Sequence, residues 1–582
     1  MGRSRRGVWV ILVALSSAAC SSAVPPAGGP TAAGPTAAGP TAARGPAPAV
    51  APLRSGRGLA LPTSPLTPDQ QILHAVNRLG YGPRPGDVER VRRIGVGAWI
   101  EAQLSPSDLA DPAVEQSLPA YPVLARSAAD LVREYPQPSP QVRQQLASGQ
   151  MSRQSVVEMY PPERRPAVIT AQMQAARITR AVLSERQLEE VLVDFWFNHF
   201  NVYAQKGAVR WMLPAYEREA IRPHVLGRFR DLVLATARHP AMLFYLDNWL
   251  STRADLTIPR GPNAGRRAGL NENYARELME LHTLGVDGGY TQQDVVEVAR
   301  CFTGWTIDRP QQGGGFVFRT VAHDRAEKRV LGQVIPAGGG REDGEKVIDI
   351  LVHHPATARF IATKLARRFV SDDPPPALVE RAAATFQRTD GSIRAVLETI
   401  FTSPEFWSAE AYRAKIKTPL EVVASAVRTL DGRVGAGPAG RDGSGDGGMV
   451  LAREVARLGE PLYEAQPPTG YPDRAESWVN TGALLARMNF ALGLAHNRLR
   501  GTQVDLAGAV AGADRRQPAQ VLDRLLAAVL HGEASPETHA VLAAELDSPE
   551  ITRVTPYDRV AKDTDVEKLA ALVLGSPEFQ RR

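Results

Sequence analysis

Cysteine is almost missing from the sequence, which contains Cys20 and Cys301 and no others in its 582 residues. If the N-terminal segment is removed on export, a single thiol remains, so the mature chain can form no intrachain disulfide. Its stability must then come from packing. Cys301 lies inside an expected helix between Arg300 and Phe302, so we interpret it as a buried, inert thiol rather than a nucleophile.

The short signatures of common enzyme classes are also missing. The sequence contains no Gly-x-Ser-x-Gly elbow, no His-Glu-x-x-His zinc helix, no P-loop, no dinucleotide-binding glycine run and no Cys-x-x-Cys. The Asp287-Gly288-Gly289 segment lacks the later oxygen ligands of an EF-hand. These absences argue against a serine esterase, a zinc protease, a kinase and a nicotinamide enzyme.

Lysine is scarce, with eight residues against sixty arginines, and the net charge is +6. The arginines are scattered in pairs and no aromatic residues are interleaved with a basic stripe, so we expect no binding to nucleic acid. Charged residues at 22% and hydrophobic residues at 43% are ordinary for a soluble globular protein, and the length is sufficient for a large core.

The N-terminus has the order of an export signal. Arg3, Arg5 and Arg6 form a basic start, the apolar run from Val8 to Leu15 is too short to span a bilayer, and small residues precede Cys20. This order resembles a bacterial lipoprotein signal. We therefore expect a signal peptide at 1–23, lipidation at Cys20, and an extracytoplasmic protein anchored to a membrane.

Two other interpretations of this segment stay open. Ser17 stands three residues before Cys20, where a lipoprotein signal usually has Leu, so ordinary cleavage after Ala23 would discard Cys20. Ser4-Arg5-Arg6 faintly resembles a twin-arginine signal, a route that carries prefolded and often cofactor-loaded proteins. A redox or cofactor protein would require that route.

The mature chain divides into a tether and a body. Residues 24–62 repeat Gly-Pro-Thr-Ala-Ala and cannot form a core, so we expect a semi-flexible linker. The body, 63–582, begins with a strong helix start at Thr67-Pro68-Asp69-Gln70. Helical periodicity then recurs along its length. The Gly-rich segment 431–448 has no apolar periodicity, and we expect a disordered surface insertion there.

Strand patterns are rare in the body. The best candidate is Gly313–Leu331, where Phe316 and Phe318 alternate with Val317 and Arg319, and Lys328–Leu331 could return to pair with it. The predicted fold class is therefore mainly α, a large multi-helix single body with one small β-hairpin.

The stretch from Leu270 to Trp305 is dense in charged and amide side chains, yet it is punctuated like two helices. Asn271 can cap the first helix and Gly285 can end it, whereas Thr291 with Asp294 can cap the second and Gly304 can end it. We expect any chemical site to include this stretch.

At about 100° per residue, one face of the first of these helices presents Glu277 and Glu280 together with Asn273. Two neighbouring carboxylates can hold a divalent cation or can perform acid–base catalysis. The alternative is an exposed face with ion pairs, because Arg276 is four residues from both Glu272 and Glu280. His282 falls on the opposite, apolar side and is expected to be a structural histidine.

Three other polar signals extend the candidate site. His199 ends an apolar helix beside Asn198 and Asn201, and His323-Asp324 follows the expected strand. The alternatives are a core histidine and a turn-capping aspartate. Trp305 could stack on a sugar ring, although core packing is the default for tryptophan.

Several segments together carry a family resemblance. They are HAVNRLGYGP (74–83), DFWFNHFNV (194–202), the 270–305 stretch with NENYARELMELHTLG, AHDRAEKRVLG (322–332), HHPATARFIATKLARRFV (353–370), KTPLEVVASAVRTL (417–430) and SWVNTGALLARMNF (477–490). These segments resemble the bacterial family called domain of unknown function 1800. The resemblance implies a large, helical, usually exported protein without an established activity, often encoded beside a member of the family called domain of unknown function 1501, a possible partner.

The leading hypothesis is an exported, hydrolase-like enzyme that acts on an extracytoplasmic polymer or glycan, with a divalent metal as one option. The alternative is a non-catalytic envelope lipoprotein for binding or assembly. The hypothesis assigns these residues: catalytic Glu277, Glu280 and His199; metal-ligating His199, Glu277, Glu280, His323 and Asp324; substrate-binding Asn273, Arg276, Asn198 and Trp305.

Overall fold

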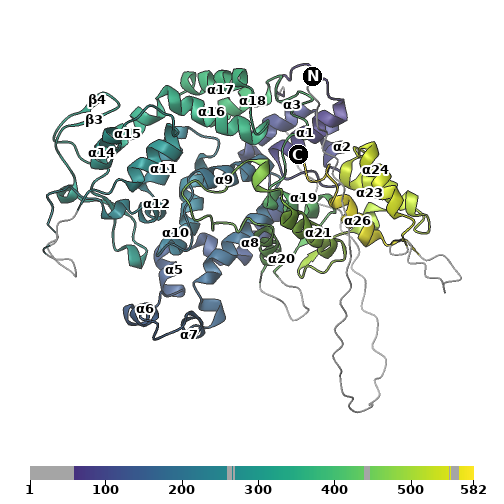
Figure 1. Ribbon diagram of the computed structural model, residues 1–582, viewed down its shortest axis with the longest axis horizontal. Helices are drawn as coiled ribbons and strands as arrows, with labels where there is room; N and C mark the ends of the chain where they lie inside the picture. Colours follow the sequence, from purple (N-terminus) through teal and green to yellow (C-terminus); the bar gives the residue numbers. More distant parts are fainter. Residues whose placement is uncertain (1–57, 258–264, 266–268, 438–445, 549–550, 552–562) are drawn as a thin grey trace, which may run out of the picture. The chain divides into compact units, whose positions relative to one another are not determined.

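The computed structural model describes residues 58–257, 265, 269–437, 446–548, 551 and 563–582. These residues belong to one compact unit, which is built almost entirely of helices, as predicted (Figure 1). The predicted signal peptide, Cys20 and most of the predicted linker lie outside the described residues. Among the described helices, none combines the length and the apolar character that a membrane crossing requires.

The helices follow one another with short connections. The first part of the body contains α1 (Pro68–Leu79), α2 (Asp87–Ile94), α3 (Val96–Gln103), α4 (Pro112–Ser117), α5 (Ala128–Glu134), α6 (Pro140–Ala147), α7 (Arg153–Glu158), α8 (Ala167–Leu183) and α9 (Gln187–His199). The middle contains α10 (Val209–Ala215), α11 (Phe229–Arg238), α12 (Pro240–Tyr245), α13 (Asn273–Glu277), α14 (Gln292–Cys301), α15 (Glu342–Val352), α16 (Pro355–Phe369), α17 (Pro376–Arg388) and α18 (Ile393–Phe401). The last part contains α19 (Pro419–Thr429), α20 (Gly447–Arg457), α21 (Thr481–Ala495), α22 (Leu506–Ala509), α23 (Pro518–Leu530), α24 (Pro536–Glu545) and α26 (Val566–Leu574).

Local signals set several helix boundaries as expected. Thr67 and Thr291 each form a capping box. The threonine side chain accepts the backbone N–H of the third helical residue, and the side chain of that residue accepts the backbone N–H of the threonine. Gly285 and Gly304 adopt positive φ angles of 84° and 80°, which favour glycine and end the helical path.

The predicted hairpin is wrong in its pairing. The strand β2 (Phe316–Phe318) pairs antiparallel with β1 (Trp305–Ile307), which precedes it, and β3 (Lys328–Val330) pairs with β4 (Gln333–Ile335). A third small sheet joins β5 (Arg433–Val434) to β6 (Thr502–Gln503). The sequence showed which residues are extended, but the pairing depends on Trp305, whose burial brings β1 beside β2.

The expected insertion at 431–448 is ordered at both of its ends. Residues 433–434 form β5, and Asp446 caps α20 by accepting the backbone N–H of Met449 at 3.1 Å. The expectation of disorder is therefore wrong for these flanks. Residues 438–445 lie outside the described part of the chain.

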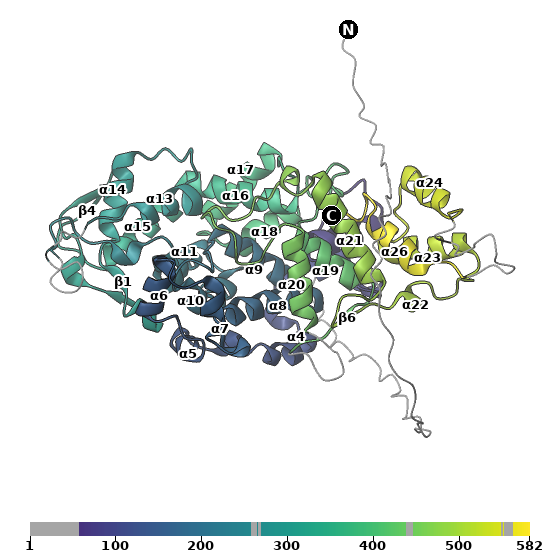
Figure 2. The same ribbon diagram turned by 60° about the horizontal axis from the view of Figure 1, so that its bottom comes forward.

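One large hydrophobic core runs through the body. Helices α8, α9, α19 and α20 are grouped in its middle, between the α14–α15 region and the α23–α26 region (Figures 1 and 2). The helix α8 packs against both α19 and α20, and α9 lies against α8. Within this central group, polar side chains of neighbouring helices contact one another inside the body, as Arg177 of α8 does with Asp194 of α9 at 2.9 Å.

Candidate functional site

The carboxylate pair predicted from the sequence lies at the surface. Glu277 and Glu280 are half-buried, and Glu280 accepts a hydrogen bond from the Tyr290 hydroxyl at 3.3 Å. Partial burial, and then the charge of Glu280, raise the pKa of Glu277. Arg276 pairs with Glu272 at 3.4 Å and donates to Gln292 at 2.8 Å. Of the carboxylates on this face, Glu272 is the one that forms an ion pair among the described residues, and Glu277 and Glu280 form none.

A change of helix type alters this stretch. After α13 the chain continues as a π-helical turn, Leu278–Thr283, in which Leu284 N donates to the Met279 carbonyl at 2.8 Å. The uniform spacing of 100° per residue therefore ends at Glu277. Asn273, predicted to bind substrate, is exposed and donates to the Leu246 carbonyl at 3.2 Å.

His199 and His282 are neighbours within the aromatic core. Nε2 of His199 lies 3.1 Å from the His282 carbonyl oxygen, and the two rings are 6.0 Å apart. Burial, followed by the nearby Lys364 ammonium, lowers the pKa of both, and that of His282 to about 3. His282 is buried as predicted. His199 joins it there as a neutral core histidine rather than joining the carboxylates.

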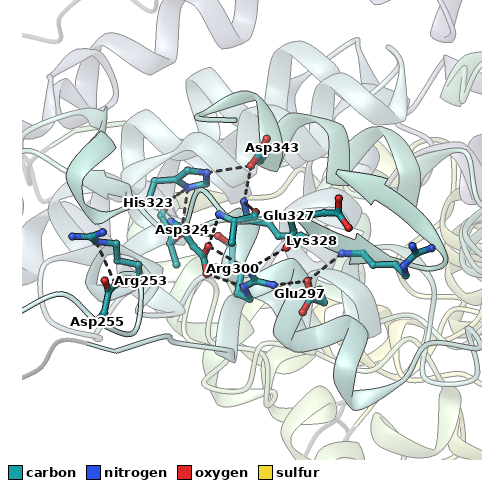
Figure 3. Close-up of polar contacts among 12 residues, drawn as sticks. Arg253, Asp255, Glu297, Arg300, His323, Asp324, Glu327, Lys328 and Asp343 are labelled. Atoms are coloured by element: carbon teal, nitrogen blue, oxygen red, sulfur yellow. Dashed lines mark hydrogen bonds and ion pairs between the residues drawn. The ribbon is translucent and has the colours of Figure 1, made fainter. Parts of the chain in front are cut away.

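His323 and Asp324 belong to a separate closed cluster (Figure 3). Nδ1 of His323 donates to the Thr303 carbonyl at 2.8 Å, and Nε2 lies 3.2 Å from Asp343 Oδ2, which also accepts from Lys328 at 2.8 Å. Asp324 accepts from Arg300 Nε at 2.8 Å. These contacts attach β3 to α15 through Lys328 and Asp343, and the 323–324 loop to α14 through Asp324 and Arg300, so both predicted ligands have structural partners.

The predicted metal-ligand set does not come together. In the described parts of the chain, no three histidine, cysteine, aspartate or glutamate side chains form a group that could hold a metal ion. The physical reason is that the five residues lie in three different environments. His199 lies in the aromatic core, Glu277 and Glu280 lie at the surface, and His323 and Asp324 belong to the cluster around Asp343 and Arg300. Trp305 is fully buried against Phe302. It is therefore packed in the core, the default for tryptophan, and is not available for the predicted stacking on a ligand.

A cavity opens instead at the C-terminal half of α9. Its empty space, about 630 Å³ with the part open to solvent included, is bounded by charged and aromatic side chains. The walls come from α8, α9, α16, the start of α19 and the segment between α20 and α21. The lining residues are Arg177, Asp194, Phe195, Phe197, Asn198, Asn201, Arg368, Thr418, Glu460, Leu462, Tyr463, Ala465, Tyr471, Pro472, Asp473 and Trp478.

The polar part of this wall begins with a stripe on α9. Glu190, Asp194 and Asn198 are spaced four residues apart, which places them along one side of a helix that is otherwise packed in the core. Arg222 binds Glu190 with two nitrogens, at 2.7 and 3.0 Å. These three residues therefore form a polar row that extends from the buried start of α9 to the cavity.

Two carboxyl groups of the cavity have raised pKa values. Burial, followed by the charge of Asp194, raises the pKa of Glu460 to about 8. Burial also raises the pKa of Asp194, against the lowering effect of the Arg177 guanidinium. One oxygen of Glu460 accepts the backbone N–H of Leu420 at 2.9 Å. At neutral pH the cavity therefore favours a protonated Glu460 beside Asp194.

Arg177 fixes the Asp194 side of the cavity. Its guanidinium contacts Asp194 at 2.9 Å and Glu217 at 2.7 Å, and its Nε donates to the Tyr463 hydroxyl at 3.0 Å. The Tyr463 hydroxyl in turn donates to Glu217 at 2.6 Å. Glu217 reaches this position from a π-helical turn, Tyr216–Ile221, a local geometry that is frequent at functional sites.

A second ion-pair group bounds the opposite side. Arg368 binds Glu421 at 2.7 Å, and Lys415 binds Asp473 at 2.8 Å. Attraction by Lys415 and then by Arg368 overcomes the effect of burial and lowers the pKa of Asp473 to about 2. Asp473 thus stays ionised where Glu460 is protonated, so the cavity contains carboxyl groups in both states.

Two asparagines hold the segment that closes the cavity. Asn198 donates to the Tyr471 carbonyl and accepts the Tyr471 N–H, both at 2.7 Å, and Asn201 donates to the Ala465 and Pro467 carbonyls at 2.9 Å. A Cβ on Gly470 would lie 2.3 Å from Asn198 Oδ1. Asn198, predicted to bind substrate, thus lines the cavity while its amide binds the chain's own backbone.

Comparison with known proteins gives a family and nothing narrower. A family model described as "Protein of unknown function (DUF1800)" matches residues 74–581. The chain belongs to this DUF1800 family. No curated protein and no solved structure matches the chain.

For this DUF1800 member, the sequence indicated one segment that lines the cavity but not the two carboxyl groups, Asp194 and Glu460, that face it. The 194–202 segment was singled out for His199 and Asn198, and of these two Asn198 lines the cavity, whereas Asp194 of the same segment was missed. The four-residue spacing from Glu190 would have indicated Asp194. Glu460 had no such signal, because it stands in a connection without periodicity.

Proposed function

We propose that the protein is a hydrolase that uses Glu460 as proton donor and Asp194 as base, acting on a glycan or another polyhydroxylated polymer outside the cytoplasm. The observation that carries this proposal is the pair itself, two carboxyl groups with raised pKa values that line the same cavity from α9 and from the segment after α20. Glycosidic bonds are commonly cleaved by such a pair, one member protonated and the other ionised.

The chemistry follows from the two protonation states. Protonated Glu460 can give its proton to the leaving oxygen of a glycosidic bond, which otherwise departs as a poor leaving group. Asp194 can remove a proton from the attacking water or stabilise positive charge on the sugar ring. Arg177, at 2.9 Å, keeps Asp194 oriented during this step.

The other walls suit a sugar-like ligand. The lining combines the aromatic side chains of Phe195, Tyr471 and Trp478 with the guanidinium groups of Arg177 and Arg368, the mixture of apolar and hydrogen-bonding groups that sugar sites use. The export signal and Cys20 support an envelope location, where such polymers occur. The lipid anchor remains part of the proposal.

The test is polymer hydrolysis by the purified body. Wild type, Glu460→Gln and Asp194→Asn are incubated with peptidoglycan and a panel of bacterial and plant polysaccharides, and new reducing ends are measured. We expect release by wild type and a loss of 10²-fold or more in both variants. Glu277→Gln is the matched control, a half-buried carboxylate away from the cavity, and should keep wild-type activity. Release that survives Glu460→Gln, or no release from any polymer, would reject the proposal.

A specific surface feature supports the alternative of a binding or assembly lipoprotein. Val479, Leu484 and Leu485 are 41%, 44% and 64% exposed around the start of α21, beside the cavity residue Trp478. A partner, for example a protein of the 1501 family, could cover them. Cross-linking from this surface in cell envelopes, lost in Leu485→Glu and retained in Glu460→Gln, would favour this function over hydrolysis.

A further inference from the structure

A second cavity lies where α1, the start of α19, the end of α23 and the C-terminal segment meet, and its empty space, with the part open to solvent included, is about 500 Å³. Its charged lining is mostly cationic: Arg413, Lys417, Arg581 and Arg582 contribute to the wall. Glu578 is the one carboxylate side chain among the described lining residues, and it accepts from Thr538 Oγ1 at 2.9 Å and from Ser535 N at 3.1 Å.

Lys417 is buried in this wall without a carboxylate partner. Its ammonium donates to Ser425 Oγ at 3.0 Å and lies 3.8 Å from the centre of the Phe579 ring. Among the ion pairs of the described residues, none includes Lys417 within 4 Å of a carboxylate. Two of the three ammonium hydrogens therefore have no hydrogen-bond acceptor of their own in the wall.

The Arg582 guanidinium is only partly satisfied, and its Nη2 donates to the Arg368 carbonyl at 3.3 Å. It is 3% exposed, and its Nη1 has no hydrogen-bond partner in the described structure. The nearest carboxylate, Glu421, lies 3.0 Å from Nε but is shared with Arg368, which approaches it at 2.7 Å. The main chain of Arg582 is occupied elsewhere, because it exchanges hydrogen bonds with Lys415. A guanidinium nitrogen of Arg582 is thus left for another acceptor.

Uncompensated buried cations are costly, and proteins normally neutralise them with a counter-charge or a shifted pKa. Burial, followed by the charges of Arg413, Arg582 and Arg487 and against the attraction of Glu421, lowers the pKa of Lys417 to about 7. His531 adds a further buried nitrogen, Nε2, with no partner in the described structure. Lys417 and Arg582 therefore bring N–H groups with unused hydrogen-bonding capacity to a wall whose described side chains include one carboxylate, which is the pattern of an anion site.

We propose that this cavity binds a small oxyanion, a phosphoryl or carboxylate group, between Lys417 Nζ and Arg582 Nη1. Ser425 and His531 flank the anion as hydrogen-bonding groups, and Arg413 and Arg581 add charge at the wall. The site is separate from the Asp194–Glu460 cavity, and the inference does not depend on the proposed hydrolase activity.

Binding is tested with the full chain, carrying any purification tag at the N-terminus so that Arg582 is unaltered. Inorganic phosphate and acetate are titrated at constant ionic strength, with chloride as the reference, by calorimetry and by thermal unfolding. We expect saturable binding of at least one oxyanion and none of chloride. A preference for phosphate assigns the site to a phosphoryl group, and a preference for acetate assigns it to a carboxylate.

Lys417→Met and Arg582→Gln should each raise the dissociation constant at least ten-fold. Ser425→Ala is a milder variant that keeps the cations, and it should weaken binding two- to five-fold even if the first two fold poorly. Arg359→Gln, which removes an exposed pair with Glu380 away from the cavity, is the control and should bind like wild type. No saturable oxyanion binding by wild type, or equal binding by wild type and Ser425→Ala, would overturn the proposal.

Discussion

Two pairs of carboxyl groups in this body differ in how the chain brings them together. Glu277 and Glu280 are three residues apart at a helix surface, whereas Asp194 and Glu460 come from α9 and from the connection after α20. Partial burial raises the pKa of Glu277, and fuller burial raises that of Glu460 to about 8. Of these two pairs, only Asp194 and Glu460 line one of the two cavities described above.

The difference teaches that spacing along a helix is weak support for a catalytic pair. Two acids on one half-buried helix face keep part of their contact with water, and charged side chains on such a face can pair at little cost. Two acids brought together by the fold must be desolvated, so their environment has to supply cations or protons. A fold retains such an arrangement only where the rest of the structure stabilises it, which makes it the better candidate for chemistry.

The largest effect is expected when Arg177, the cation that binds Asp194 of the buried pair, is removed. Arg177→Met leaves Asp194 and Glu217 without their shared guanidinium, and we expect a loss of about 3–5 kcal/mol in the free energy of unfolding. Urea unfolding followed by circular dichroism measures it. The surface counterpart, Arg276→Met, should cost less than about 1 kcal/mol. Equal losses in the two variants would mean that the buried group contributes no more than a surface pair.

Next in size is the effect of pH on Glu460. Its folded-state pKa of about 8 exceeds the ordinary 4.5, so the folded chain holds the proton more tightly than the unfolded chain. The free energy of unfolding should therefore fall as pH rises from 4.5 to 8. Glu460→Gln should abolish this decline, which is on the order of 3 kcal/mol. Parallel pH profiles of wild type and variant, measured by urea unfolding, would show that Glu460 is not protonated at neutral pH.

The wall that brings Glu460 to the cavity can be tested at Gly470. Its φ is +68°, and an added methyl group would meet Asn198, so Gly470→Ala should destabilise by about 1–3 kcal/mol. Gly332→Ala is the control for backbone strain, because Gly332 has φ +80° and open space around it. In thermal unfolding, the melting temperature of Gly470→Ala should be lower than that of Gly332→Ala. Equal melting temperatures would mean that the Asn198 side chain can move away from the added methyl group without loss of stability.

The smallest effect is expected at the surface pair. Glu277→Gln combined with Glu280→Gln should change the free energy of unfolding by less than about 0.5 kcal/mol, because both side chains are accessible to water. The double variant should also keep any hydrolytic activity. A loss of activity that matches Glu460→Gln would return the catalytic site to the 270–305 stretch.

Sequence predicted most of what depends on local chemistry. The helical class, the capping boxes at Thr67 and Thr291, the turn at Gly285 and the burial of His282 follow from residue type and spacing. The strand pairing failed because the partner of β2 is chosen by the packing of Trp305. His199 lies in the aromatic core rather than in the cavity, which spacing could not show because the same helix has both a core face and a cavity face.

The candidate site was only partly within reach of sequence. Asp194 and Asn198 follow Glu190 at four-residue intervals in an apolar helix, a stripe that is readable without a structure. Glu460 and Tyr463 are not readable in this way, since they lie in a connection and reach the cavity through long-range contacts with Leu420 and Arg177.

The two hydrogen bonds between Asn198 and the backbone of Tyr471 also make the cavity wall a reporter of local opening. The Tyr471 amide is protected by a side chain rather than by a helix or sheet, so its hydrogen exchange measures how often this segment leaves α9. Exchange much faster than in the surrounding helices would describe an entrance that opens while the core stays folded. The same amide would slow when a ligand fills the cavity.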